Sequence, residues 1–533
     1  MNQLNKKLLP KDGLAGLKEN FTRDALSGFL VFLIAMPLSL GIAKASDFPP
    51  VMGLLTAIIG GVIVSLVAGS KLTIKGPAAG LIVICSGAVA AFGGGENGWE
   101  MALAAILVAG LLQIVFGFLR FGKLSDFFPA AAIHGMLAAI GLIIISKQVH
   151  TLLGIDPALL KGKEPLELFA MIPESIAHAD WHIEIVGLLG LSILFGLSAI
   201  KHPLVKKIPV PLLVLGIAIP LGILMNFKTD EPAYALVKVG SLFDKIGFNV
   251  DFSGIASHPG AFAQYVVLFA LIGSIESLLT VKAIDGLDPF KRKSDTNRDL
   301  VAVGLGNSLA AVLGGLPMIS EVARSSANVA NGARTRWANF FHGLFLLIFL
   351  IAAVPLIEMI PNAALAAMLI FVGFRLAHPR EFIHTWHIGK EQFLIFVCTL
   401  VLTLATDLLI GVFSGVLIKF IIHLINGAGL RNMFRSDFEV IQPDGKSYIV
   451  RIKGSAVFTN LLGLKKALME IPMEGDITVD FSRVKMVDHT TLKTIQTIKD
   501  DVEMEGGSFT ILGLEEMKAM SAEPTATRIA VSN

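Results

Sequence analysis

Two charged residues stand inside or beside apolar stretches and are the first candidates for chemistry. Glu276 lies within the run LIGSIESLLT, and Lys75 directly precedes a Gly-Pro pair. An ionisable side chain in a membrane-spanning helix costs about 2.5 to 3.5 kcal/mol on insertion scales, so it is a functional candidate by default. Glu276 is thus a candidate site for a cation or a proton. The alternative is a structural ion pair, for instance with Lys75.

A second pair of charges follows Pro317 in the segment PMISEVARSSANV. Glu321 and Arg324 are three positions apart, which places them on one face of a helix. A carboxylate at a helix start is favoured by the dipole, but it repels an anion unless it is protonated or paired. Glu321 is therefore either part of a binding site or only a partner of Arg324. Lys75 either extends to the membrane interface or supplies fixed positive charge near an anion.

The elements that must position these residues are apolar helices. Hydrophobic residues make up 54% of the chain and charged residues 16%, whereas a soluble protein has about 25% charged residues. The net charge of +2 gives no support to a nucleic-acid binder. A membrane-spanning helix needs about 20 apolar residues. We expect fourteen spans, at residues 24–44, 50–69, 76–92, 100–119, 126–147, 185–200, 208–227, 262–281, 299–315, 317–331, 338–358, 361–378, 392–407 and 409–426.

The third and tenth spans are too short to cross a membrane as full helices. Pro77 opens one and Pro317 opens the other, and proline at the first helical position naturally follows an extended segment. We expect two half-helices that begin near mid-membrane from opposite sides, with their unpaired N–H groups and positive dipole ends converging. Such a pair predicts an anion site.

An internal repeat supports this arrangement. Residues 128–137, FPAAAIHGML, resemble residues 360–369, IPNAALAAML, at an offset of 232, and the two prolines are 240 apart. The offsets predict two seven-span copies, about 24–230 and 260–430, and an odd number of spans inverts the second copy relative to the first. The alternative is chance similarity among helices rich in Ala and Leu.

Lysine and arginine accumulate in the even-numbered loops, which predicts that these loops and both termini are cytoplasmic. Residues 1–23 read as a cytoplasmic segment without the pattern of a removable signal peptide. The expected location is the inner (plasma) membrane. From residue 437 to residue 533 the pattern changes to strand, helix, strand, helix, which predicts a small cytoplasmic α/β domain. No Walker motif, metal-ligand cluster or nucleophile with a base supports an enzyme or a cofactor.

Several segments, in chain order, resemble the SulP family of anion transporters. They are DALSGFLVFLIAMPLSLGIA, DFPPVMGL, LIGSIESLLT, DTNRDLVAVGLGN, PMISEVARSSANV and NGARTRWA. The tail is similar to the STAS domain of that family. The resemblance implies two inverted seven-span repeats arranged as core and gate domains, usually a homodimer in the lipid bilayer. It also implies transport of sulfate, bicarbonate or a similar anion, with Na⁺ or H⁺ as coupling ion in some relatives and a cytoplasmic protein partner as an option for the STAS domain.

The resemblance also implies roles for individual residues. The substrate-binding residues would be Lys75, Gly76, Ala78, Ala79, Ser320, Glu321, Val322, Ala323 and Arg324, and the coupling-ion residues Glu276, Thr280 and Glu321. Lys75, Glu321 and Leu38 depart from the usual family pattern. Because Lys75 and Glu321 carry opposite charges and both flank a predicted helix start, we expect one electrostatic unit with the substrate between them.

The leading hypothesis is therefore secondary active transport of a small inorganic anion by alternating access. The alternatives are a passive anion channel or exchanger, a nucleobase transporter of the same fold, and a membrane-anchored signalling protein. Asn307 is expected to satisfy exposed backbone or link helices. Thr490, in the turn where STAS switches carry a hydroxyl, is either phosphorylated or part of an ordinary helix N-cap, a role typical of Asp or Thr.

Overall fold

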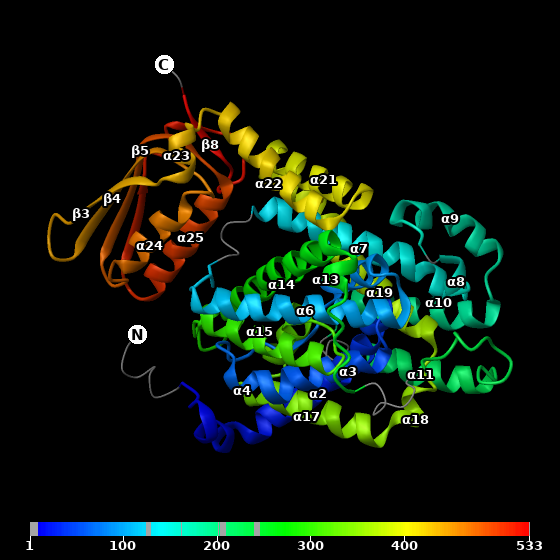
Figure 1. Cartoon of the computed structure of the whole chain (residues 1–533). Coiled ribbons are helices and arrows are strands. Elements are labelled where there is room, and N and C mark those ends of the chain that lie inside the picture. The colour runs from blue at the N-terminus through cyan, green and yellow to red at the C-terminus, as the bar shows by residue number, and fades with distance from the viewer. Residues whose placement is uncertain are drawn as a thin grey trace. The chain divides into compact units, whose positions relative to one another are not determined.

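The structure is a computed structural model that describes residues 9–123, 129–160, 162–200, 202, 209–238 and 246–531 (Figure 1). Four parts of the sequence predictions lie outside these residues. They are residues 1–8 of the N-terminal segment, the start of the fifth span with Phe128 of the repeated motif, residue 208 at the start of the seventh span, and residues 532–533 of the tail.

Helices of the first half of the chain occur where the first seven spans are predicted. They are α2 (Gly13–Ala45), α3 (Pro50–Ile58) continued by the π-helical turn η1 (Ile59–Val64) and α4 (Ser65–Val67), the 3-10 turn η2 (Ala79–Leu81) continued by α5 (Ile82–Ala91), α6 (Gly95–Phe118), α7 (Ala130–Leu152), α10 (Trp181–Ala199) and α11 (Val210–Leu224).

Helices of the second half coincide with the remaining predicted spans. They are α14 (Pro259–Leu287), α15 (Thr296–Val312), α16 (Val322–Ala330), α17 (Trp337–Ala352), α19 (Asn362–Leu376), α21 (Lys390–Ala405) and α22 (Leu408–Ile425). The predicted span 338–358 also contains the short helix α18 (Val354–Ile357). Shorter helices outside the predicted spans are α8 (Pro157–Leu160), α9 (Pro165–Ala177), α13 (Gly254–Ser257), α20 (Pro379–Ile388) and α23 (Leu430–Phe434). In the described chain, eight helices are long and apolar enough to cross a membrane.

The order of elements repeats, as the sequence motifs predict. Each copy begins with two helices, continues with a short strand and a short helix, and then has a further helix. In the first copy these elements are α2, α3, β1 (Lys75–Pro77), α5 and α6. In the second copy they are α14, α15, β2 (Met318–Ser320), α16 and α17. Helices of the two copies pack closely, because a Cβ placed on Gly110 of α6 would lie 2.9 Å from the carbonyl oxygen of Gly304 in α15. Small residues permit such contacts between apolar helices.

The starts of the two short helices require a correction. Pro77 and Pro317 were predicted to be first helical residues, but Pro77 ends β1 and Pro317 precedes β2, so the helices begin later, at Ala79 and Val322. The two strands pair antiparallel, and this pairing keeps Pro77, the last residue of β1, in extended backbone. Proline fits such a short edge because it has no N–H group to leave unsatisfied.

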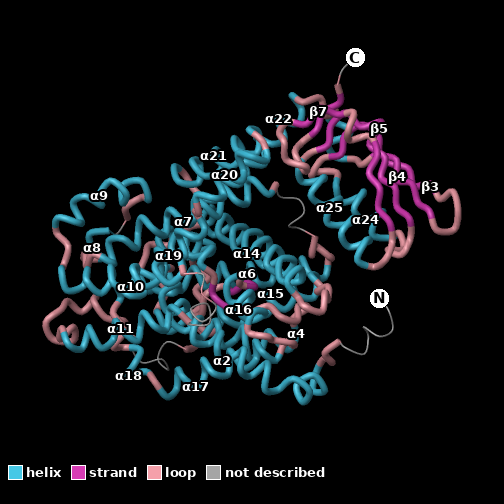
Figure 2. Tube along the Cα trace, turned by 180° about the vertical axis from the view of Figure 1, so that it is seen from behind, coloured by secondary structure: helices cyan, strands magenta, loops and turns pink. Residues whose placement is uncertain are grey.

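The tail forms the predicted small α/β domain. It contains β3 (Asp437–Ile441), β4 (Ser447–Ala456), α24 (Leu461–Glu470), β5 (Asp476–Val487), α25 (His489–Met504), β6 (Ser508–Leu512), β7 (Met517–Ala519) and β8 (Arg528–Ala530). The sheet order is β3-β4-β5-β8-β7, and β6 also pairs with β5. The β4–β5 and β5–β6 pairs are parallel. Figure 2 shows the helices α24 and α25 beside this sheet.

The core of the tail follows from residue spacing. Ile477, Val479 and Phe481 alternate along β5 and are fully buried, as expected for a strand with one covered face. Apolar residues three or four positions apart on α24 and α25 face the same core, at Leu464, Leu468, Leu492, Ile495, Ile498 and Val502.

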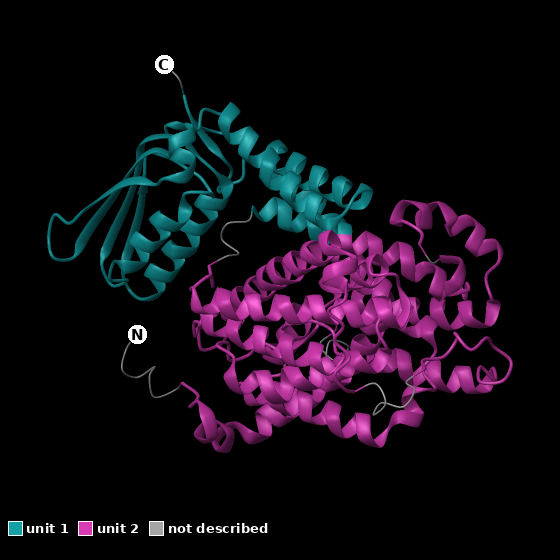
Figure 3. Cartoon of the chain, in the orientation of Figure 1, with its two compact units in different colours: residues 1–6, 126–139, 377–533 teal, residues 7–125, 140–376 magenta. Residues whose placement is uncertain are grey.

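The chain divides into two compact units (Figure 3). Unit 1 holds the described parts of residues 126–139 and 377–533, and unit 2 the described parts of 7–125 and 140–376. Helices α20, α21 and α22 thus belong to the same unit as the tail. The boundary expected from the sequence between residues 430 and 437 stays a prediction. Both charged pairs singled out above lie in unit 2.

A buried ion pair joins α22 to the tail within unit 1. The Nζ atom of Lys419 lies 2.9 Å from Oδ2 of Asp488, and both side chains are fully buried. Asp488 is the N-cap of α25, where it accepts the N–H of Thr491 at 2.9 Å. Lys419 also donates to Oγ1 of Thr490 at 2.8 Å and lies 4.6 Å from the centre of the Phe458 ring. The turn is therefore capped by Asp488, and the Thr490 hydroxyl is engaged by a lysine.

The charges around Asp488 decide its protonation. Burial alone would raise the pKa of this carboxyl, but Lys419 and His423 hold the pKa at about 2. Because the folded-state pKa is below the ordinary value of about 3.9, the carboxylate stabilises the fold above that pH, and the contribution is lost as pH falls toward 2.

We expect Asp488→Asn to lower the thermal unfolding temperature of the full-length protein in detergent substantially, because removing one partner of a buried ion pair costs about 3 to 5 kcal/mol. Asparagine still caps a helix, so the loss reports the charge. Asp480→Asn is the matched control, since Asp480 pairs with the partly exposed Arg451 at 3.1 Å, and such a pair contributes about 0 to 1 kcal/mol. Adding Lys419→Met to Asp488→Asn should recover stability. Equal effects of the two asparagine variants would contradict the role of the buried pair.

Candidate functional site

The short strands β1 and β2 lie among the helices of unit 2 (Figure 2) and pair with each other to form a two-stranded ribbon. Lys75 pairs with Ser320, Gly76 with Ile319 and Pro77 with Met318. The ribbon is extended by a hydrogen bond of 2.9 Å from the N–H of Glu321 to the carbonyl of Ile74. Backbone that leaves the helical conformation at membrane depth must find partners inside the protein, and this pairing supplies them.

Side chains complete the hydrogen bonding of the ribbon. Asn307 of α15 accepts the N–H of Met318 at 2.6 Å, which confirms the prediction that this residue satisfies exposed backbone. Ser325 of α16 accepts the N–H of Ile74 at 2.9 Å. Ser277 of α14 accepts the N–H of Ser320 at 3.1 Å. The ribbon is therefore fixed by three surrounding helices.

Each strand leads within two residues into a short helix. Ala78 is the N-cap of the turn η2, and Glu321 is the N-cap of α16, where its side chain accepts the N–H of Arg324 at 3.3 Å. In the antiparallel register Pro77 pairs with Met318 and Lys75 with Ser320, so the two short helices leave the ribbon at its opposite ends. The convergence of their dipole ends on one anion stays a prediction. The first N–H groups of a helix have no acceptor within it and carry its positive dipole end.

Arg324 places a buried positive charge beside the paired strands. Its side chain is fully buried, and its Nε atom lies 3.5 Å from Oε2 of Glu321, as the spacing predicts. Among the described residues, none of its three guanidinium nitrogens has a hydrogen-bond partner. The guanidinium lies against the opposite strand, because a Cβ on Gly76 of β1 would lie 2.7 Å from Nη1. A buried guanidinium with unfilled donors can bind an anion with good geometry.

Glu276 of α14 lies at the other helix start. A Cβ on Gly80, in the turn η2, would collide with both of its carboxylate oxygens, so only glycine allows this approach. The Oε1 atom is buried and has no hydrogen-bond partner among the described residues. Thr280 follows one turn later on the same helix and is also buried. A carboxylate at the positive end of a helix, with an unfilled acceptor, is suited to a cation or a proton.

Lys75 has a partner that the sequence analysis did not name. Its Nζ atom lies 3.0 Å from Oδ1 of Asp299 in α15, and the two side chains are essentially inaccessible. The same nitrogen donates to Ser70 at 2.6 Å and to Thr73. Asp299 is 224 residues from Lys75. The sequence did contain an indication of this partner, because Asp299 is the first residue of the ninth predicted span. Two opposite charges that are buried in apolar surroundings are expected to pair.

The predicted site residues thus fall into groups. Gly76, Ala78, Ala79, Ser320, Glu321, Arg324 and Glu276 surround the two helix starts. Val322 and Ala323 begin α16 and are exposed on one side. We expected Lys75 and Glu321 to act as one electrostatic pair around the substrate. In the structure the Lys75 ammonium instead forms an ion pair with Asp299. Whether any of these residues contacts substrate stays a prediction.

We expect Lys75→Met and Asp299→Asn each to lower the thermal unfolding temperature of the protein in detergent strongly, because each leaves one buried charge uncompensated at a cost of about 3 to 5 kcal/mol. The double variant should be closer to the wild type than either single variant. Lys75→Met with Glu321→Gln is the comparison cycle and should be additive. Recovery in the Glu321 cycle and not in the Asp299 cycle would favour the pairing expected from sequence.

Comparisons with known proteins place the chain in a family. A model of the sulfate permease family matches residues 21–399. The YvdB protein of Bacillus subtilis is 25% identical, over 93% of this chain and 92% of that protein. The bicarbonate transporter BicA of Picosynechococcus sp. is 24% identical, over 78% and 72% of the two chains. The solved structure of SLC26A9 shares the fold at 15% identity with a TM-score of 0.67, over 93% of this chain and 85% of that one. The chain belongs to the sulfate permease family.

Proposed function

We propose that this multi-pass membrane protein moves a small inorganic anion, bicarbonate or sulfate, as a secondary active transporter. The observation that carries the proposal is the fully buried Arg324 guanidinium, which has no hydrogen-bond partner among the described residues and lies against Gly76 of the opposite strand. The family description names sulfate, and a relative is named as a bicarbonate transporter. Both anions match a site made of helix starts and one guanidinium.

The charges support binding of an anion at this place. The Lys75 charge is neutralised by Asp299 at 3.0 Å, and Arg324 is only partly neutralised by Glu321 at 3.5 Å. An anion between the helix starts would fill the free guanidinium donors and receive the N–H groups of both helices. Because the backbone recognises charge and size, the choice between bicarbonate and sulfate depends on few side chains.

Coupling follows from Glu276. Its unpartnered carboxylate stands at the helix start that we assign to the anion, so an ionised Glu276 would repel the substrate. Binding of Na⁺ by Glu276 and Thr280, or protonation of Glu276, removes this repulsion. Each ion would then raise the binding affinity of the other, and this positive coupling is the thermodynamic basis of symport. Alternating access, a homodimer, an inner-membrane location with cytoplasmic termini and a cytoplasmic partner of the tail remain part of this proposal.

The function is tested by uptake of labelled sulfate and of labelled bicarbonate into proteoliposomes, with sodium, pH and voltage gradients imposed separately. We expect one of the anions to accumulate when an inward Na⁺ or H⁺ gradient is imposed. Flux that follows voltage alone would instead indicate a passive channel. No movement of either anion under any gradient would contradict the proposal.

We expect Arg324→Ala to weaken anion binding about ten- to hundred-fold, because hydrogen bonds to a charged group contribute about 1.5 to 3 kcal/mol. Arg324→Lys retains the charge without the fork of donors and should fall between the wild type and Arg324→Ala. Binding is measured by titration calorimetry on detergent-solubilised protein, with the unfolding temperature as a check on folding. Unchanged affinity in a folded Arg324→Ala variant would remove Arg324 from the site.

We expect Glu276→Gln to abolish the dependence of uptake on the coupling gradient while the protein stays folded, because glutamine keeps the shape of the side chain and loses its charge. Glu391→Gln is the matched control, since Glu391 of α21 has the same exposed fraction of 8% and an Oε2 atom without a partner among the described residues. Glu391 belongs to unit 1, whereas Glu276 lies against Gly80 in unit 2. Wild-type rates with unchanged ion dependence in Glu276→Gln would refute the coupling role.

A further inference from the structure

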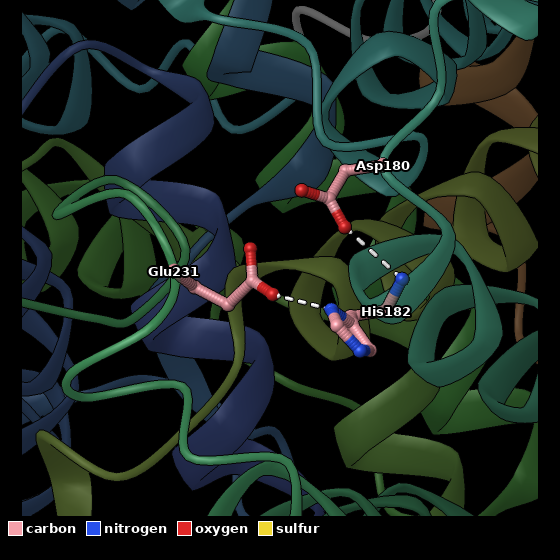
Figure 4. A group of neighbouring side chains, drawn as sticks. All are labelled: Asp180, His182 and Glu231. Atoms are coloured by element: carbon pink, nitrogen blue, oxygen red, sulfur yellow. Dashed lines mark hydrogen bonds and ion pairs between the residues drawn. The ribbon is translucent and has the colours of Figure 1, made fainter.

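A group of metal-ligating side chains lies in unit 2 apart from the paired strands (Figure 4). Asp180 and His182 stand at the start of α10, and Glu231 lies in the segment after α11. Each residue offers one ligand atom, and these three atoms all lie within 4.8 Å of one another. No motif links them in the sequence, because Glu231 is 49 residues from His182.

The side chains of the group are oriented by the fold. Asp180 is the N-cap of α10 and accepts the N–H groups of His182 at 3.0 Å and of Ile183 at 3.4 Å through Oδ1, which fixes its carboxylate beside the imidazole. The Nδ1 atom of His182 lies 2.8 Å from Oε1 of Glu231. Figure 4 shows Asp180 and Glu231 approaching His182 from two different segments. Hydrogen bonds that fix the first ligands are typical of metal sites.

The charge of the group is unbalanced. The Glu231 side chain is 4% exposed and the His182 side chain 32%, so a buried carboxylate shares its surroundings with a second carboxylate and one imidazole. Among the described residues, no lysine or arginine forms an ion pair with Asp180 or Glu231. Two carboxylates this close repel each other when both are ionised, and a bound cation would remove this repulsion.

The donor set selects the kind of cation. Imidazole nitrogen suits zinc, nickel and copper, whereas magnesium and calcium take oxygen ligands. Two ligands of one zinc ion lie about 2.0 to 2.2 Å from it and therefore at most about 4.4 Å apart. The three ligand atoms lie within 4.8 Å of one another, so they would move slightly closer together around an ion. Three protein ligands leave a position for water.

We propose that Asp180, His182 and Glu231 bind one divalent transition-metal ion such as Zn²⁺, at a site separate from the anion site. The ion would join the start of α10 to the segment after α11. It would stabilise the folded protein by mass action, because the unfolded chain lacks the assembled ligands.

The test uses full-length protein in detergent, stripped of metal by a chelator and dialysed. We expect one equivalent of Zn²⁺ to bind in titration calorimetry and to raise the unfolding temperature, whereas Mg²⁺ and Ca²⁺ do neither. Co²⁺ in place of Zn²⁺ should give visible absorption bands of a low-symmetry site. Binding by Mg²⁺ equal to that of Zn²⁺ would overturn the assignment of a transition-metal site.

The variants locate the ion. His182→Ala should abolish the Zn²⁺-dependent rise in unfolding temperature, and the isosteric Glu231→Gln should weaken Zn²⁺ binding more than about tenfold. His178→Ala is the matched control, because His178 is an exposed histidine four positions before His182 whose ring bonds to the carbonyl of Glu174 at 2.9 Å, and it is not part of the group. Equal Zn²⁺ binding by His178→Ala and Glu231→Gln would show that the group is an ordinary ion pair. The unfolding temperature without metal reports whether each variant folds.

Discussion

Extended backbone in apolar surroundings must satisfy its own N–H and carbonyl groups, and the rest of the site depends on how this chain meets that requirement. No water is available at membrane depth, so the segments before the two short helices can be extended only because they pair with each other. The pairing determines where both helix starts lie. It also explains the polar side chains around it, since Asn307, Ser325 and Ser277 each accept one of the remaining N–H groups.

The ribbon also organises the buried charges. Lys75 and Ser320 are paired residues of the two strands, and Asp299 accepts from both of their side chains. The lysine charge is thereby neutralised by a carboxylate of the protein itself. Arg324, on the following helix, keeps guanidinium donors that no described residue fills. Lys75 thus forms a structural ion pair, whereas Arg324 keeps donors that a ligand could fill. This division of roles comes from geometry, because the two side chains carry the same charge.

The sequence predicted those features that depend on local spacing. Pro77 and Pro317 indicated two interrupted spans, the separation of Glu321 and Arg324 indicated their contact, and the alternation along β5 indicated the sheet of the tail. Features that depend on distant segments were not predicted. The pairing of the strands moved both helix starts beyond the prolines, and the partner of Lys75 is 224 residues away. The approach of Glu276 to Gly80 requires the packing of α14 on the turn η2, which no local pattern encodes. The family resemblance supplied the residue roles.

The strand pairing has a mechanical consequence. Each strand continues within two residues into its short helix, so the two helix starts cannot separate without breaking the ribbon and leaving its buried N–H and carbonyl groups without partners. Helices α14 and α15 are attached to the same ribbon through Ser277 and Asn307. We therefore expect these elements to move together in any rearrangement of the protein. Sliding surfaces, if the helices move past one another, lie at the outer faces of this body, and the ribbon itself is a poor place for a hinge.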